Sequence, residues 1–188
     1  DRLNSFKSEY EKLYALIKNC NLVIHEMEEE NTEMAKSCYA TAYTMRGVAY
    51  YNLMRLFCEP YNKQKAGEQL GLSIVTRFDM EARPKRSSLS EVVSLIEEDL
   101  KKGISYNSKS EIFRYTVDVA KAYLARLYFW SQNWEQAIPV AKEILEAYPL
   151  VEGTEYVDML SAQHAQKGNI LLRSYVLSHV SGDQNYNG

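Results

Sequence analysis

The chain has 188 residues, a length that suits one domain or a piece of a larger one. Hydrophobic residues make up 46% of the sequence, which is enough for a core and too many for a disordered chain. The net charge is −3, so the chain has no basic field of the kind that binds nucleic acid.

The first predicted element is an amphipathic helix over residues 5–28. Its apolar residues recur at alternating steps of four and three, at Phe6, Tyr10, Leu13, Ile17, Cys20, Ile24 and Met27. This spacing is typical of a helix with one buried face, and it favours core positions for Phe6 and Tyr10. Thr32 follows as the predicted N-cap of the next helix.

The second predicted helix runs to about Cys58, and Pro60 stops it. It is apolar nearly all round, except for a narrow polar stripe formed by Thr41, Thr44, Asn52 and Arg55. Neighbours must cover such a helix on several sides, so we expect it to be the most buried element. Arg46 lies opposite the stripe, and we expect its guanidinium to be buried and paired with a carboxylate or with helix-end carbonyls.

A loop is predicted from Tyr61 to Arg86, because this stretch contains two glycines and a proline. Within the loop, Leu72–Thr76 has the pattern of a short extended piece.

A capping box formed by Ser88 and Glu91 predicts the start of a third helix, which Gly103 is expected to end. The carboxylates at 97–99 fall mostly on its predicted outer side. Two adjacent carboxylates can do acid–base chemistry in a cleft, but a solvated helix face is the favoured interpretation here.

Two more helices are predicted, at 116–131 and from Asn133 to Pro149. Asn133 and Gln136 form a second predicted capping box. The expected inward stripe of the second helix is Ala137, Ile138, Ala141, Ile144, Leu145 and Tyr148. The pair resembles a tetratricopeptide repeat, with residues at the signature spacing at Leu124, Ala125, Tyr128, Trp134, Ala137 and Pro149. Beyond this pair, the pattern favours a short helix at 156–166 and an extended segment at 170–180.

The sequence contains no catalytic pattern. His25, His164 and His179 are scattered, and neither a phosphate-binding glycine loop nor a nucleophile elbow occurs. The three cysteines match no disulfide framework or zinc motif, so we interpret them as small buried hydrophobes. The 15 tyrosines suit both helix packing and sugar or peptide contacts, and their helical spacing favours packing. We predict a protein that is not an enzyme and needs neither metal nor cofactor.

Four passages in chain order carry a more specific pattern. They are Tyr10, Tyr14, Ile17 and Asn21 in the first helix; Arg46–Tyr51, Leu53, Phe57, Pro60 and Tyr61 in and after the second; Gly71–Thr76 with Arg86–Leu100; and Ala120–Leu150. Together they resemble the SusD/RagB family of outer-membrane nutrient-binding lipoproteins of Bacteroidetes. The sequence departs from the family pattern at Gly47, Cys58 and Ser73, where only turns and packing are affected.

The resemblance implies a mainly α fold of right-handed tetratricopeptide-like helix pairs with minor extended segments. Residues 1–150 would form the SusD-like helical scaffold, with the tetratricopeptide-like pair at 117–149. Residues 151–188 would be the loop-rich start of a C-terminal part that is missing here, because family members are far longer. Arg46, Asn21 and Pro60 would be structural residues.

The implied function is capture of an oligosaccharide or peptide on the extracellular face of the outer membrane. The partner would be a SusC-like TonB-dependent porin, and a lipid anchor absent from this chain would hold the full-length protein to the membrane. The candidate ligand-binding residues are Phe6 and Tyr10 in a predicted N-terminal loop and Tyr61 in the turn after Pro60. Because few loops converge here, we expect this chain alone to bind glycans weakly or not at all.

The alternative hypothesis is an intracellular helical-repeat adaptor that binds a protein segment on its concave face. Such an adaptor needs further repeats of the same period, and the sequence contains only one matching pair.

Overall fold

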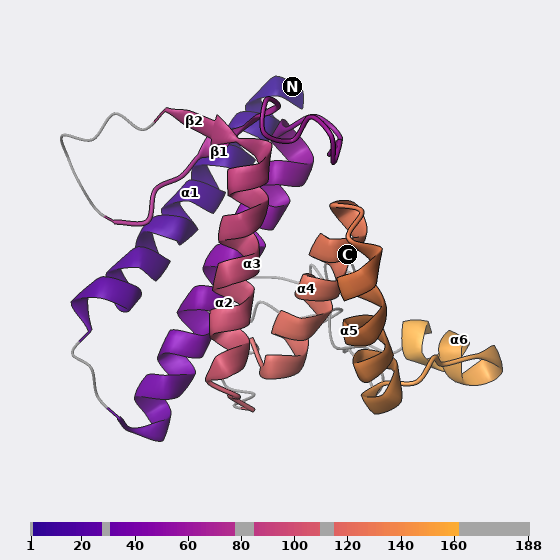
Figure 1. Ribbon diagram of the computed structural model, residues 1–188. Coiled ribbons are helices and arrows are strands. Elements are labelled where there is room, and N and C mark those ends of the chain that lie inside the picture. The colour runs from indigo at the N-terminus through magenta and orange to yellow at the C-terminus, as the bar shows by residue number, and fades with distance from the viewer. Residues whose placement is uncertain (1, 28–30, 78–84, 110–114, 162–188) are drawn as a thin grey trace, which may run out of the picture.

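A computed structural model of the chain describes residues 2–27, 31–77, 85–109 and 115–161. The apolar periodicity of the first two predicted helices produces α1 (Arg2–Glu26) and α2 (Glu33–Phe57), which lie side by side and antiparallel (Figure 1). The Thr32 hydroxyl caps α2 by accepting a hydrogen bond from the Ala35 amide at 3.1 Å. Both predicted helices and the predicted N-cap are confirmed.

A two-stranded hairpin follows α2. Strand β1 (Leu70–Ser73) pairs antiparallel with β2 (Arg86–Ser88), and the predicted extended piece overlaps β1 and the residues after it. Helix α3 (Leu89–Ser105) starts directly after β2. The Ser88 hydroxyl accepts from the Glu91 amide, and the Glu91 carboxylate accepts from the Ser88 amide at 2.7 Å, so the predicted capping box is confirmed.

Gly103 does not end α3, contrary to the sequence-based prediction. The helix continues to Ser105, and Gly103 lies buried inside it against α2. A Cβ atom at this position would collide with Oγ1 of Thr44. The glycine therefore allows the two helices to approach closely. Thr44, a member of the predicted polar stripe of α2, is buried at this contact and does not face solvent.

Helix α2 forms the centre of the core, between α1 and α3, and it holds more buried residues than any other described helix. The predicted position of this helix is therefore confirmed. The core combines α2 with apolar side chains of every described helix except α6, and its fully buried large members include Ile17, Tyr50, Leu53, Met54, Leu89, Ile96, Leu100, Leu127 and Tyr128. Of the cysteines, Cys20 is buried, whereas Cys38 and Cys58 are only half-buried.

The last described helices are α4 (Val117–Trp130), α5 (Trp134–Ala147) and α6 (Gly153–Ser161). Helix α4 packs on α3, and α5 packs on α4, which gives the expected tetratricopeptide-like pair. Asn133 is the N-cap of α5, but its side chain makes no capping hydrogen bond, so the second predicted capping box is wrong.

The predicted inward stripe of α5 is only partly confirmed: Ala137 is buried, Ala141, Ile144 and Tyr148 are half-buried, and Ile138 and Leu145 are exposed. Among the described elements, only α4 packs against α5, so one side of the stripe is covered and the other is not. The extended segment predicted at 170–180, together with His164 and His179, lies outside the described residues. No helix in the described part of the chain is long and apolar enough to cross a membrane.

Candidate functional site

A buried polar network ties the first three helices together around Arg46. Its Nε and Nη2 donate to Asp99 Oδ2 and Oδ1 at 2.8 and 2.7 Å, and its Nη1 donates to Asn21 Oδ1 at 2.8 Å. The side chains of Arg46 and Asp99 are only 6% and 3% exposed, so the predicted buried pairing of Arg46 is confirmed. Asp99 points inward, unlike the outer side predicted for most of residues 97–99.

The electrostatics of this pair favour a structural role. Burial raises the pKa of Asp99, and the two hydrogen bonds and the positive charge of Arg46 act against that rise. A charge buried in this way is stable only while its partner remains in place. The network therefore fixes the relative positions of α1, α2 and α3 and offers no exposed acid or base.

Side chains of α1 and α2 hold the extended backbone that follows β1. The Tyr14 hydroxyl donates to the Ser73 carbonyl at 2.9 Å, and Asn21 Nδ2 donates to the Val75 carbonyl at 2.8 Å. The Tyr50 hydroxyl accepts from the Val75 amide at 2.8 Å. Burial raises the pKa of Tyr50 to about 12, so its hydroxyl stays neutral near pH 7. In the first-helix motif, Tyr14 and Asn21 therefore have a structural role, because they hold this backbone segment against the helices.

Phe6 and Tyr10, two of the predicted ligand-binding residues, lie on α1 and not in a loop. Both rings meet Phe57 of α2 edge to face, with centroid separations of 6.3 and 5.1 Å. They are 48% and 37% exposed, so the core positions favoured by their register are wrong: the described elements leave this end of α1 uncovered. Tyr10 also borders a small cleft of about 250 Å³ with Phe57, Leu72, Ser73 and Arg86.

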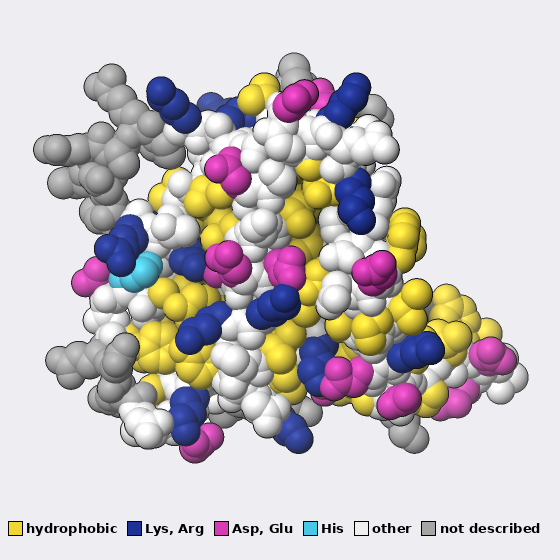
Figure 2. All heavy atoms as spheres, viewed as in Figure 1, with side chains coloured by type: hydrophobic (Ala, Val, Ile, Leu, Met, Phe, Trp, Pro, Cys, Tyr) yellow, Lys and Arg dark blue, Asp and Glu magenta, His cyan; other side chains and the backbone are white. Residues whose placement is uncertain are grey.

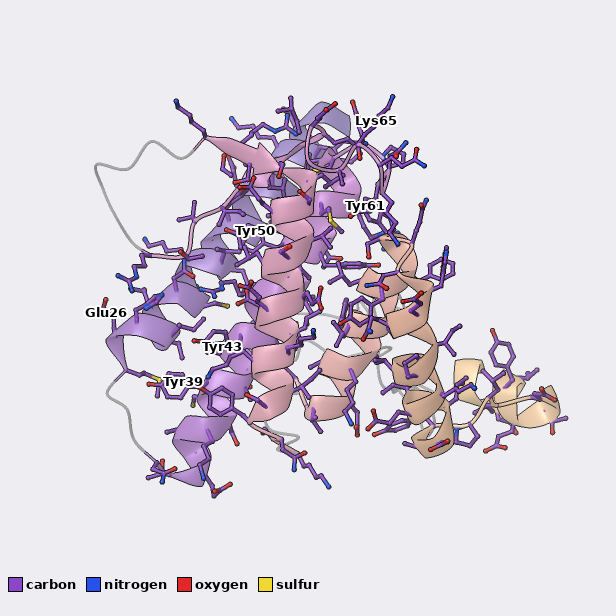
Figure 3. All side chains as sticks on the ribbon, viewed as in Figure 1. Glu26, Tyr39, Tyr43, Tyr50, Tyr61 and Lys65 are labelled. Atoms are coloured by element: carbon purple, nitrogen blue, oxygen red, sulfur yellow. The ribbon has the colours of Figure 1, made fainter. Side chains whose placement is uncertain are left out.

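Tyr61, the third predicted ligand-binding residue, is packed differently. It is half-buried against the core, and its ring centroid lies 6.2 Å from that of Trp130 on α4. The Pro60 carbonyl accepts a hydrogen bond from Gln69 Nε2 at 2.9 Å, which closes the turn after α2. The structure therefore gathers Phe6 and Tyr10 around Phe57, whereas Tyr61, labelled in Figure 3, packs against α4.

A larger pocket, of about 760 Å³, lies at the other end of the same helices. Three tyrosines line it: Tyr39 and Tyr43 from successive turns of α2, and Tyr106, the C-cap of α3. The Tyr106 ring lies nearly parallel to those of Tyr39 and Tyr43, with centroids 5.9 and 6.3 Å apart and interplanar angles of 16° and 22°. Figure 3 shows Tyr39 and Tyr43 near the lower end of α2, far from Tyr61.

Sequence reasoning missed this pocket. The spacing of Tyr39 and Tyr43 by four residues predicts helix packing, and it does place both rings on one face of α2. Tyr106 reaches them only because α3 continues beyond Gly103. Polar side chains complete the lining, among them His25, Lys36, Lys102 and Ser105.

Comparison with known proteins gives one consistent family. Residues 2–129 match the model of the SusD-like family, which is described as starch-binding and associating with outer membrane. No curated protein matches the chain.

Several solved structures share its fold, and three of them illustrate the likeness. A SusD superfamily protein from Bacteroides thetaiotaomicron has a TM-score of 0.73 at 22% identity, covering 85% of this chain and 36% of its own length. A SusD-like carbohydrate binding protein from Bacteroides vulgatus has a TM-score of 0.66 at 19% identity, covering 84% and 34%. A laminarin binding SusD-like protein has a TM-score of 0.59 at 20% identity, covering 73% and 29%.

The chain thus spans about a third of the length of these structures. The family match covers more than half of the chain and includes the residues of the Arg46 network, the hairpin and the three-helix core. The chain belongs to the SusD-like family.

Proposed function

We propose that the chain is part of a cell-surface protein that captures glycans for a TonB-dependent nutrient uptake system. The observation that carries this proposal is the match of residues 2–129 to a family described as starch-binding and associating with outer membrane. The likeness in fold to a laminarin binding protein adds a second glucan to the ligands worth testing. The partner in this proposal is a SusC-like TonB-dependent porin, and a lipid anchor holds the full-length protein at the outer face of the outer membrane.

The chain's part in this function is mostly that of a scaffold. The Arg46 network and the core around α2 hold α1, α2 and α3 in fixed positions, which suits a body that carries ligand-binding groups. We assign the scaffold to residues 1–150 and the surface facing the porin to its helices. The exposed apolar side chains of α5 give that surface the character of an interface.

Glycan contact in this proposal is made by aromatic faces, because a sugar ring offers a thin apolar face beside its hydroxyl groups. The exposure of Phe6 and Tyr10 supports their candidacy as ligand-binding residues. Tyr61 is the weaker candidate, because Trp130 and the core already occupy much of its ring.

Native gels cast with soluble starch or laminarin test the glycan function. We expect the full-length protein to be retarded by at least one polysaccharide and the 188-residue chain to be retarded weakly, because a piece of a binding site buries little of the sugar. Bovine serum albumin serves as the unretarded control. If the full-length protein migrates as albumin does on every polysaccharide and also binds no peptide pool, the proposed function is wrong.

A second experiment tests the partner. Full-length protein carrying an affinity tag, incubated with detergent-solubilised Bacteroides outer membranes, should retain a TonB-dependent porin that mass spectrometry identifies. An adaptor of intracellular proteins would instead retain cytosolic proteins and leave the porin unbound.

A further inference from the structure

We propose that the pocket lined by Tyr39, Tyr43 and Tyr106 is a sugar-binding subsite that takes one or two pyranose units of a neutral glucan. This inference rests on the proposed function and refines it, because it places a ligand contact inside the helical scaffold itself. We call this the tyrosine pocket, and it is distinct from Phe6, Tyr10 and Tyr61.

The three tyrosines lie outside the hydrophobic core cluster. The hydrophobic core cluster and the side chains packed against it include Tyr14, Tyr50, Tyr61 and Tyr128, among others, but not Tyr39, Tyr43 or Tyr106. All three are half-buried and border a pocket of about 760 Å³. This volume lies within the range of roughly 300–1,000 Å³ that is usual for small-molecule sites.

The rings of the three tyrosines form one stacked cluster. Tyr106 lies nearly parallel to both α2 tyrosines, at interplanar angles of 16° and 22°. The rings of Tyr39 and Tyr43 each stack with that of Tyr106, with centroids about 6 Å apart, so the three residues form one aromatic cluster in the lining of the pocket. Aromatic surface of this kind suits the C–H face of a pyranose ring, which leaves its hydroxyl groups free to meet polar neighbours.

Polar side chains share the lining of the pocket with the aromatic cluster. Lys102 Nζ lies 5.4 Å from the Tyr106 ring centroid, and an ammonium group offers three donors to sugar hydroxyls. Ser105, one helical turn closer to the end of α3, adds a hydroxyl oxygen that can accept a hydrogen bond, because its proton is donated to the Lys102 carbonyl at 2.7 Å. On the other wall, Lys36 is already paired with Glu33 at 3.0 Å, so it contributes less free charge. A polar lining that contains three tyrosines matches a neutral polyhydroxyl ligand.

Contacts within the protein already hold two of the three rings in place. The Tyr39 hydroxyl donates to the Met27 carbonyl at 3.1 Å, which links the ring to the end of α1. The guanidinium of Arg46 lies 5.5 Å from the Tyr43 ring centroid and is itself fixed by Asp99. Rings that are already ordered lose little conformational freedom on binding, which favours affinity. Figure 2 shows hydrophobic side chains beside Lys or Arg side chains at the lower left of the molecule.

The test is a titration of the 188-residue chain, followed by the NMR signals of its tyrosine rings, with maltohexaose and with laminarihexaose. We expect shifts of the tyrosine-pocket signals with a dissociation constant on the order of 1 mM for at least one of the two. Tyr106→Ala should weaken binding about tenfold, the loss that corresponds to one aromatic stacking contact.

A second variant is needed because Tyr106 is the C-cap of α3, so Tyr106→Ala also affects folding. Lys102→Gln removes the ammonium from an exposed position and should weaken binding several-fold. Its matched control is Lys101→Gln on the same helix, where the lysine pairs with Glu97 and does not line the pocket. Ser105→Trp, which places an indole at the pocket mouth, should abolish binding.

The outcomes separate this inference from the proposed function. If the shifts map to Phe6 and Tyr10 and the pocket variants bind normally, the pocket inference is overturned and the proposed function stands. If the chain binds neither oligosaccharide at about 10 mM, the pocket inference is overturned as well, and gel retardation of the full-length protein still decides the proposed function. Loss of binding in Lys102→Gln but not in Lys101→Gln supports the pocket.

Discussion

The two halves of the described structure treat their apolar surfaces in opposite ways. In α1, α2 and α3 the amphipathic faces meet one another, and residues such as Tyr50, Leu53 and Ile96 are fully buried. In α5 and α6 comparable faces stay open, with Ile138 56% and Val157 58% exposed. Figure 2 shows hydrophobic side chains at the surface where α5 and α6 lie. The comparison shows that helical periodicity predicts which residues share a face, but burial of that face depends on a neighbour.

The polar contacts of the two halves differ in the same sense. The first half contains the buried pair of Arg46 and Asp99, which joins α2 to α3. Helices α4 and α5 are linked at the surface, where the Tyr148 hydroxyl donates to Asp118 Oδ2 at 2.8 Å. Lys121 also pairs with Glu143 there. These partly exposed contacts add less to stability than the buried pair, so we expect the first half to dominate the cooperative unfolding of the chain.

The largest expected effect comes from breaking the buried pair. Arg46→Ala should lower the free energy of unfolding by about 3–5 kcal/mol, because it strands Asp99 in the core without its partner. Arg46→Met should cost less, because it keeps the packing of the long side chain. Urea unfolding followed by circular dichroism measures both values. Small and equal losses for the two variants would show that the pair does not hold the first half together.

The second prediction compares one isoleucine from each half. Ile96→Ala should cost about 2–5 kcal/mol, because it opens a cavity in the core. Ile138→Ala removes the same atoms from a side chain that is 56% exposed, and should cost less than about 0.5 kcal/mol. The same urea experiment measures both. A large loss for Ile138→Ala would mean that the apolar face of α5 is covered in solution, for instance by self-association, which sedimentation analysis would detect.

A third prediction concerns the close contact between α2 and α3. Gly103→Ala should destabilise the chain by about 1–3 kcal/mol, although alanine is the better helix former, because the new Cβ collides with Thr44 Oγ1. Thr44→Ala made in the same chain should remove most of that loss. The four unfolding free energies of this double-mutant cycle should therefore be strongly non-additive. Additive losses would place the two helices further apart than the structure does.

The sequence predicted the helices of the first half more completely than the packing of the second half. Apolar spacing and capping residues predicted α1, α2 and α3, and the isolation of Arg46 on an apolar helix predicted its burial. The partner Asp99 was missed because it stands beside Glu97 and Glu98 in an acidic run that is typical of a solvated face. Pairing across 53 positions is a tertiary event, and no local pattern reports it.

The candidate site was harder to predict for the same reason. Phe6 and Tyr10 have the spacing of core residues, but their exposure depends on what covers the start of α1. The tyrosine pocket needs Tyr106 beside Tyr39 and Tyr43, and that meeting follows from the crossing of α2 and α3 at Gly103. The sequence shows each ring but not their convergence.

The smallest expected effect concerns the N-termini of two helices, because α3 has a complete capping box and α5 has none. The hydrogen bonds from Ser88 lower the pKa of Glu91 below its usual 4.5. A carboxyl group with a lowered pKa in the folded state stabilises the fold at pH values above its unfolded pKa, and that contribution is lost as the pH falls through the folded value. The stability of the chain should therefore decline below about pH 4.5 partly through Glu91, and Glu91→Gln should make that decline shallower.

Unfolding free energies of both proteins between pH 3 and pH 7 measure the difference, with Glu135→Gln in the first turn of α5 as the matched control. An equal change in slope for the two variants would show that the box at α3 contributes no more than an ordinary carboxylate near a helix start.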